Sequence, residues 1–258
     1  MLDAVILAGG KLGIDDTLYH ESPHGSRSLI EFHGKPMAQW VIDALDKAAS
    51  VADLYLIGVP ADRGLKAVKP LHFLPDQSEM VENIRYGVLQ SHQDHPDRQK
   101  ALIVSTDIPA VEPYMIDWLA GQVADDPQQL LYYNVIQKET MEARFPNANR
   151  SYVHFKDISV CGGDLNAVDK NIFSAERPVW KKLSDARKTP LKQAGLIGID
   201  TLLLVALRLI TLETTVKRVC KRLDLDAKAL VCPYAEMGMD ADKPHQLAIL
   251  RQHLQGVL

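Results

Sequence analysis

Cysteine is scarce in this chain, and the three that occur, Cys161, Cys220 and Cys232, are widely separated. An odd number of cysteines without paired metal-ligand spacing indicates neither a disulfide framework nor a zinc site. The basic region and apolar core of a signal peptide are also missing after Met1, where a strand-like segment begins at once. Both absences favour a protein of the reducing cytoplasm.

A strong excess of one charge is missing as well. The 29 Lys and Arg residues against 33 Asp and Glu residues give a net charge of -4, and the pI is near 6.1. Such a chain has no bulk attraction to nucleic acid, so any phosphate that it binds must be held by local groups. Nucleic acid is therefore not an expected partner.

Long apolar segments are rare, and the longest one, residues 195–212, is interrupted by Asp200 and Arg208. Each such charge costs roughly 2.5–3.5 kcal/mol at a bilayer centre, and a span needs about 20 apolar residues. We interpret the segment as a helix that is either buried or forms a dimer contact, and in the second case the protein is a homodimer. The alternative is a helix lying on a membrane surface, with its basic flanks 181–192 and 217–222 contacting anionic lipid.

The composition that remains, 47% hydrophobic and 24% charged over 258 residues, is that of one globular domain with a substantial core. Strand and helix patterns alternate along the first half, which predicts an α/β fold: a Rossmann-like three-layer α/β/α sandwich with a mostly parallel central sheet. The expected strands are 5–10, 53–59, 101–107 and 130–136, and the expected helices are 37–49, 79–90 and 113–123.

The opening strand runs into two glycines through Leu7, Ala8, Gly9 and Gly10. These glycines serve either a tight turn or a close approach of backbone N–H groups to a base or phosphate. The spacing is not the dinucleotide-binding G-x-G-x-x-G, and the chain has no Walker G-K-[ST]. Both of those nucleotide-binding classes are thereby disfavoured.

Asp107 stands at the exit of the apolar segment 101–109. A carboxylate at the carboxyl edge of a parallel sheet is a common metal-ligand position in α/β enzymes, although Asp is also an ordinary turn residue. Near the end of the chain, Asp240 and Asp242 precede Pro244, where they could instead cap a helix over 244–254.

Three features together resemble the MobA-like NTP transferases, which are related to molybdenum cofactor guanylyltransferase and to sugar-1-phosphate nucleotidylyltransferases. They are the opening glycine segment, the run 27–37 with its Gly-Lys-Pro-Met turn, and the two Asp segments. The resemblance covers nearly the whole chain and implies a single nucleotidyltransferase domain, 1–258, of the nucleotide-diphospho-sugar transferase type. Residues 181–223 have no counterpart in the short members, and we expect a helical insertion there.

The resemblance implies that Asp107 and Asp242 are catalytic residues that bind Mg²⁺. Arg27 falls where the family usually has Lys, and is expected to clamp the phosphates as a third catalytic residue. Lys35 either assists Arg27 or caps a helix.

Carried over by position, the remaining site residues divide between the two substrates. The nucleotide-binding set is Leu7, Ala8, Gly9, Gly10, Arg27, Ser78 and Asn83. The acceptor-binding set is Gly162, Gly163 and Asp164. Local alternatives exist for both: Ser78 could cap the next helix, and residues 161–164 could form a strand-to-helix turn in which Asp164 is the cap.

The implied reaction moves a nucleoside monophosphate group from a nucleoside triphosphate to a small phosphorylated acceptor, such as a sugar or polyol phosphate, and releases pyrophosphate. Two alternatives belong to other classes of protein. One is a degenerate family member that binds nucleotide as a sensor, suggested by the irregular first loop. The other is a membrane-associated interaction protein that uses the apolar segment 195–212.

Overall fold

A computed structural model describes residues 1–22, 25–174, 179–180, 182 and 190–256, without the side chains of residues 190–193. In this part of the chain, nine strands form one sheet in the order β5-β4-β1-β6-β10-β7-β9-β8, and β11 pairs with β7. The strands are β1 Leu2–Leu7, β4 Val51–Ile57, β5 Leu71–Leu74, β6 Lys100–Ser105, β7 Leu131–Gln137, β8 Val153–His154, β9 Ser159–Gly162, β10 Leu165–Asp169 and β11 Ala227–Cys232. A separate hairpin joins β2 Glu31–Phe32 to β3 Lys35–Pro36.

The sheet is parallel where the chain alternates strand and helix. β5, β4, β1 and β6 all run in one direction, so their carboxyl ends meet at the same edge. β10 then enters antiparallel between β6 and β7, and β11 adds a parallel pair beyond β7. The parallel half therefore gathers the glycine segment after β1 and Asp107 after β6 at one edge.

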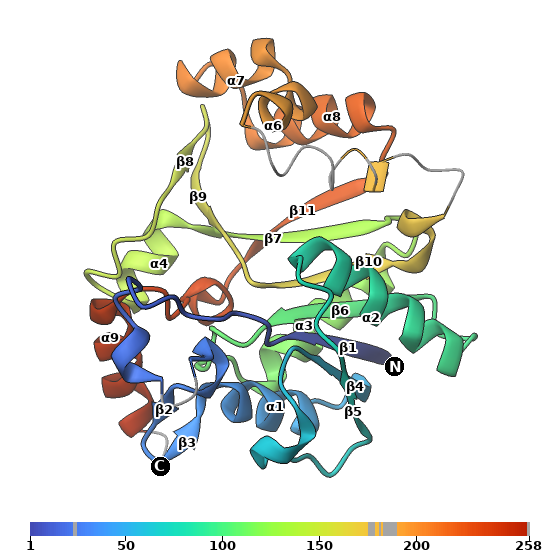
Figure 1. Ribbon diagram of the computed structural model, residues 1–258. Coiled ribbons are helices and arrows are strands. Elements are labelled where there is room, and N and C mark those ends of the chain that lie inside the picture. The colour runs from blue at the N-terminus through green and yellow to red at the C-terminus, as the bar shows by residue number, and fades with distance from the viewer. Residues whose placement is uncertain (23–24, 175–178, 181, 183–189, 257–258) are drawn as a thin grey trace.

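Helices cover both faces of the sheet, as Figure 1 shows. The residues in each core cluster place α1, α3, α4 and α9 on one face, with α2 and α8 on the other. The helices are α1 Met37–Lys47, α2 Met80–Asp94, α3 Pro113–Asp125, α4 Lys138–Arg144, α6 Pro190–Ile197, α7 Ile199–Ala206, α8 Leu212–Leu223 and α9 Pro244–Gln255. The predicted three-layer α/β/α sandwich is confirmed, with β10 and β9 as the antiparallel part of a mixed sheet.

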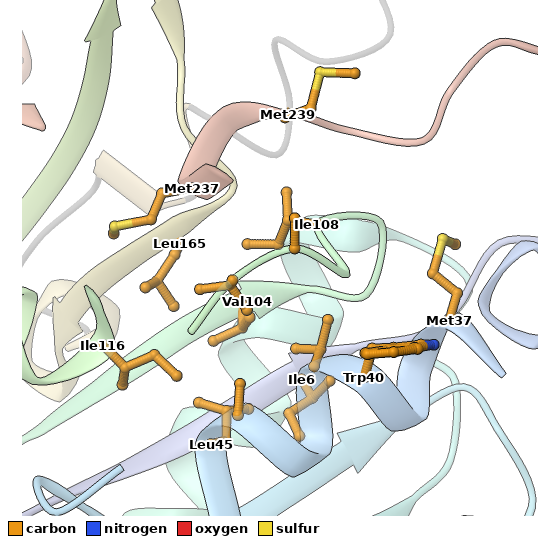
Figure 2. Close-up of a cluster of buried hydrophobic side chains, with 14 of the residues drawn as sticks. Ile6, Met37, Trp40, Leu45, Val104, Ile108, Ile116, Leu165, Met237 and Met239 are labelled. Carbon is orange, nitrogen blue, oxygen red and sulfur yellow. The ribbon is translucent and has the colours of Figure 1, made fainter. Parts of the chain in front are cut away.

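The main core extends to the carboxyl edge of the sheet. Figure 2 shows Ile108, Leu165 and Met237 in one apolar cluster, and all three are fully buried. Ile108 directly follows Asp107, Leu165 directly follows Asp164, and Met237 lies three residues before Asp240. Three acidic side chains are thus anchored by apolar neighbours in the same chain segments.

The alternative of a strand-to-helix turn at residues 161–164 is wrong, because a strand follows. β9 and β10 both pair antiparallel with β7, and between them the Gly163 N–H donates to the Asn134 carbonyl at 2.8 Å. Residues 163 and 164 therefore form a bend between two strands, β9 and β10, that both pair with β7. Asp164 consequently caps no helix.

The expectation of one buried helix over 195–212 is also wrong. Gly198, with φ of 97°, separates α6 from α7, and residues 207–211 separate α7 from α8. Leu203 and Leu207 are 59% and 58% exposed. Among the described residues, the helices are too short or too polar for any of them to cross a bilayer. The division into one domain with an insertion at 181–223 stays a prediction, since residues 181 and 183–189 lie outside the described part.

A charged cluster ties the opposite edge of the sheet together. Arg98 pairs with Asp3 at the start of β1 and, at 2.9 Å, with Asp53 in β4. Ser91 of α2 donates to Asp3 at 2.7 Å, and the Asp3 side chain is fully buried. Burial alone raises the pKa of Asp53, but its hydrogen bonds with Arg98, His72 and His95 outweigh burial and lower it.

We predict that Arg98→Met destabilises the protein by about 3 kcal/mol, because it leaves the buried carboxylate of Asp3 without its cation. The matched control is Arg85→Met in α2, whose partner Glu82 is solvent-accessible. That variant should lose less than about 1 kcal/mol. Urea unfolding measures both losses, and equal losses would contradict the role given to Arg98.

Candidate functional site

The glycine segment after β1 is closely packed against neighbouring loops. A Cβ on Gly9 would lie 3.3 Å from Asp76 Oδ1 and 3.4 Å from Asn83 Nδ2. Gly58 has φ of 99°, and a Cβ there would lie 2.5 Å from Gly9 Cα. The backbone contact and the positive φ require glycine at position 58, and a side chain at position 9 would crowd Asp76 and Asn83. Gly58, which sequence analysis did not single out, therefore shapes the predicted nucleotide loop.

Arg27 stands at the end of the long first loop and faces two carboxylates. The loop closes on itself where the Leu12 N–H donates to the Gly25 carbonyl at 2.8 Å and the Arg27 N–H to the Gly10 carbonyl at 3.1 Å. The guanidinium then forms ion pairs with Asp242 and, at 3.4 Å, with Asp16. Arg27 and Asp242, which are 215 positions apart in sequence, are thus brought together.

Backbone hydrogen bonds assemble the acidic residues at the end of β6. The Ser105 N–H donates to the Asp164 carbonyl at 2.9 Å, and the Asp164 N–H donates to the Met237 carbonyl at 2.8 Å. The Ala241 N–H donates to the Asp107 carbonyl, also at 2.8 Å. Predicted metal-binding and acceptor-binding residues therefore occupy one site.

Arg150 is the site residue that sequence analysis missed. Its guanidinium pairs with Asp240 and lies 3.8 Å from Asp164 Oδ2. Asp240 is buried and also accepts from Gln246 Nε2 at 3.1 Å, so it holds its loop in place. Arg150 belongs to an irregular loop between α4 and β8, where no motif or periodicity marks it. No sequence signal could have identified it.

The four Asp side chains at this edge outnumber the two Arg side chains, Arg27 and Arg150, that face them. The pKa values of three of these carboxyl groups are raised. Burial raises the pKa of Asp107 to about 6, and the nearby carboxylates of Asp240 and Asp242 add to the effect. Burial, followed by the charge of Asp107, raises the pKa of Asp164 to about 8. Burial also raises the pKa of Asp240 despite its pairing with Arg150.

The acidic cluster opens into a cavity of about 590 Å³ that contains most of the predicted site. Its lining includes Gly9, Gly10, Arg27, Asp107, Gly163 and Asp164. A second cavity of about 1060 Å³ shares Gly10, Lys11 and Leu12 with it. The first loop therefore borders two adjoining spaces, both large enough for a small ligand.

Ser78 lies in the loop before α2, whereas Asn83 lies in the first turn of α2 itself. Asn83 is buried, donates to Asp76 Oδ1 at 2.9 Å and accepts from the Gln77 N–H at 2.7 Å, so its amide orders the loop beside Gly9. Ser78 has φ of 67° and makes no cap, because α2 begins after Glu79. The alternative role of Ser78 as a helix cap is therefore wrong.

Two further local alternatives fail. α9 begins after Lys243 without a side-chain cap, so neither Asp240 nor Asp242 is its N-cap. Lys35 neither caps a helix nor reaches Arg27: it pairs with Asp43 at 2.9 Å and lies 3.8 Å from the centre of the Trp40 ring.

The predicted glycines at the acceptor side differ in their surroundings. A Cβ on Gly163 would lie 3.0 Å from Asn134 Cβ, and one on Gly162 would lie 2.5 Å from the Tyr133 hydroxyl. Gly163 lines the acidic cavity, whereas Gly162 lines an apolar cavity on the far side of Tyr133. A side chain at position 163 would crowd the backbone of Asn134, and one at position 162 would displace the Tyr133 side chain.

The residues present fit a magnesium ion that carries phosphate ligands. Within the described ranges, His, Cys, Asp and Glu side chains form no group of three or more that could hold a metal ion. Mg²⁺ usually takes only one or two carboxylates and completes its shell with phosphate oxygens and water. Asp107 Oδ1 is buried with no hydrogen-bond partner in the described structure, and the charge of Asp242 acts on it. A buried carboxylate oxygen that lacks a hydrogen-bond donor suits a cation.

Comparison with known proteins identifies the family. Residues 4–142 match the MobA-like NTP transferase domain. The chain belongs to this family. Its predicted resemblance is thereby confirmed, and with it membership among the nucleotidyltransferases. None of the curated proteins matches the chain in sequence.

Solved structures of relatives have the same fold as this family member. A hypothetical transferase from Thermus thermophilus is 30% identical with a TM-score of 0.80, over 95% of this chain and 99% of that one. CMP:2-keto-3-deoxy-manno-octonic acid synthetase complexed with CTP is 12% identical with a TM-score of 0.60, over 100% of both chains. 4-diphosphocytidyl-2C-methyl-D-erythritol synthase from Anaerococcus prevotii is 10% identical with a TM-score of 0.59, over 99% of this chain and 96% of that one. The last two show the fold alone.

We predict that the metal-free protein loses stability as the pH rises from about 4 to about 8. Folded carboxyl groups with raised pKa hold protons there that the unfolded chain has released, so the free energy of unfolding falls with pH. Asp164→Asn removes one of these groups, and its stability relative to wild type should therefore increase with pH.

Urea unfolding in the presence of a chelator, at about pH 5 and about pH 8, measures this difference between variant and wild type. A difference that is the same at both pH values would contradict the burial of a poorly compensated Asp164.

Proposed function

We propose that this family member is a Mg²⁺-dependent nucleotidyltransferase. It transfers a nucleoside monophosphate group from a nucleoside triphosphate to a small phosphorylated acceptor and releases pyrophosphate. The observation that carries the proposal is the buried, unpartnered Oδ1 of Asp107 on the wall of a cavity that also contains the glycine segment and Arg27. This arrangement offers a cation ligand, backbone donors and a guanidinium to one bound triphosphate.

For nucleotidyl transfer, a protein needs mainly to align the two substrates and to neutralise the charge on their phosphates. Mg²⁺, when bound by Asp107 and Asp242, would neutralise phosphate charge and polarise the reacting phosphorus. Gly9 and Gly10 bring backbone N–H groups to the cavity without side chains in the way. Asn83 holds the loop of Asp76 beside Gly9, next to where we place the nucleoside.

Arg27 has the chemistry of a phosphate clamp. It is always charged, and its planar fork can donate two parallel hydrogen bonds to a phosphate group. Its pairing with Asp242 places it beside the proposed metal ligand. We infer that a bound triphosphate shares Arg27 with Asp242, which couples phosphate binding to the position of the carboxylate.

We place Asp164 at the phosphate of the acceptor. Because its pKa is raised to about 8, it holds a proton at neutral pH while the cation is absent. A protonated carboxyl group can donate a hydrogen bond to an acceptor phosphate without repelling it. Attack of an acceptor phosphate oxygen on the α-phosphorus of the triphosphate then needs no nucleophilic side chain.

We predict that Asp107→Asn removes the Mg²⁺-dependent part of triphosphate binding and lowers turnover at least about 100-fold. A thermal-shift screen of nucleoside triphosphates with and without Mg²⁺ measures binding, since a ligand that binds only the folded protein raises its stability. Pyrophosphate release with sugar and polyol phosphates measures turnover. The matched control is Asp97→Asn, an exposed residue before β6 at the opposite edge of the sheet, which should behave as wild type.

Two results would overturn parts of the proposal. If triphosphates stabilise the protein equally with and without Mg²⁺, the metal site is wrong. If a triphosphate binds with Mg²⁺ but no acceptor gives pyrophosphate, the chain is better described as a nucleotide sensor.

A further inference from the structure

A third cavity, about 360 Å³ in volume, lies between α8 and the sheet and is lined almost entirely by apolar atoms. Its floor is the face of β7 and β11 that carries Leu131, Tyr133, Val135, Ala227 and Ala229. The volume is within the range of about 300–1,000 Å³ that is usual for small-ligand sites. We refer to this space as the α8 cavity.

The amphipathic pattern of α8 predicts closer packing than the structure has. An apolar stripe repeats along the helix at intervals of three and four residues and faces the cavity: Leu212, Val216, Val219 and Leu223. Of the α8 side chains, Leu223 alone is buried. On the opposite wall, Ala227 and Ala229 are too small to fill the space. Protein interiors are normally close-packed, so an unfilled apolar space of this size beside a helix suits apolar molecules.

The α8 cavity adjoins the predicted active site. Leu131 and Tyr133 line both the α8 cavity and the acidic cavity of Asp107 and Asp164. Between these two regions the floor of the acidic cavity is itself apolar, formed by Ile103, Val168 and Leu131. A polar space and an apolar space thus lie next to each other on one face of the sheet, with Leu131 and Tyr133 between them.

We propose that the α8 cavity binds the hydrocarbon chain of the acceptor, so that the acceptor is an amphiphile with a phosphate head and an apolar tail. This inference rests on the proposed nucleotidyl transfer. The head lies at Asp164 and Asp107, and the tail passes Tyr133 to lie under α8. An oxygen of the head phosphate forms a bond to the α-phosphorus, the bond from that phosphorus to the β-bridging oxygen breaks, and pyrophosphate leaves with the electron pair.

The far end of the cavity is also surrounded by apolar side chains. Val153 and Leu212 line it there, and β8, which carries Val153, contacts α7. α7 exposes Ile199 and Leu203 on its surface. A chain longer than the cavity would therefore meet further apolar surface where it emerges.

The test compares dodecyl phosphate, below its critical micelle concentration, with glycerol phosphate as acceptors in pyrophosphate release. A dansyl-labelled fatty acid reports binding in the α8 cavity by fluorescence, independently of turnover. Ala229→Phe fills the cavity from the floor, and Val216→Phe fills it from the helix in case the first variant folds poorly. The matched control is Val231→Phe, which lies on the same strand and face but is outside the cavity lining and 46% exposed.

The proposal predicts that dodecyl phosphate has a KM at least tenfold lower than glycerol phosphate and displaces the dansyl probe. Each filling variant should weaken probe binding and raise the KM for dodecyl phosphate at least tenfold, with the KM for glycerol phosphate unchanged. Val231→Phe should match wild type in every measurement.

Two failures are distinguishable. If triphosphate binds with Mg²⁺ and glycerol phosphate gives pyrophosphate, but the probe does not bind or binds equally to the filling variants, the amphiphilic acceptor is wrong and the proposed function stands. If the probe binds as expected but no triphosphate binds or turns over, the proposed function fails, and the assignment of an acceptor fails with it.

Discussion

The structure depends on one electrostatic constraint: four carboxylates, Asp107, Asp164, Asp240 and Asp242, face two guanidiniums at the carboxyl edge of the sheet. Backbone hydrogen bonds from Ser105 to Asp164 and from Ala241 to Asp107 fix these segments, so the carboxylates cannot move apart. A buried carboxylate without a partner is costly. The folded chain therefore keeps protons on this cluster that a cation can replace.

Buried carboxylates at the two edges of the sheet differ in whether their charge is compensated. At the edge where β1 and β4 begin, Arg98 and Ser91 satisfy Asp3, and hydrogen bonds hold the pKa of Asp53 below its usual range. At the other edge, burial raises the pKa of Asp107 and Asp164, and one oxygen of each has no hydrogen-bond partner in the described structure. The first arrangement stabilises the fold. The second leaves carboxylate groups whose favourable interactions form only when a ligand binds.

Sequence analysis could predict the parts of the site that are encoded locally. Asp107 follows an apolar strand, and the turn with His33 and Gly34 at positive φ leads through Lys35 and Pro36 into α1 at Met37. Both patterns occupy a few consecutive residues. The alternation of strands and helices likewise predicted the parallel half of the sheet.

The parts that could not be predicted depend on contacts between distant segments. Arg150 is a site residue only because its loop packs against Asp240, 90 positions along the chain. The strand β10 follows a Gly-Gly pair that looks like a turn, and its partners on β6 and β7 make it extended. The apolar run 195–212 reads as one helix, but Gly198 takes a positive φ that ends α6.

A cation that binds at the four carboxylates should displace protons from them, and calorimetry tests this most directly. Binding of a triphosphate already complexed with Mg²⁺ is measured at about pH 6, close to the pKa of Asp107, in buffers of different ionisation enthalpy. The dependence of the heat on the buffer gives the number of protons released. We expect the wild type to release protons on binding and Asp107→Asn to release fewer. Binding without proton release, or with the same release in both proteins, would contradict it.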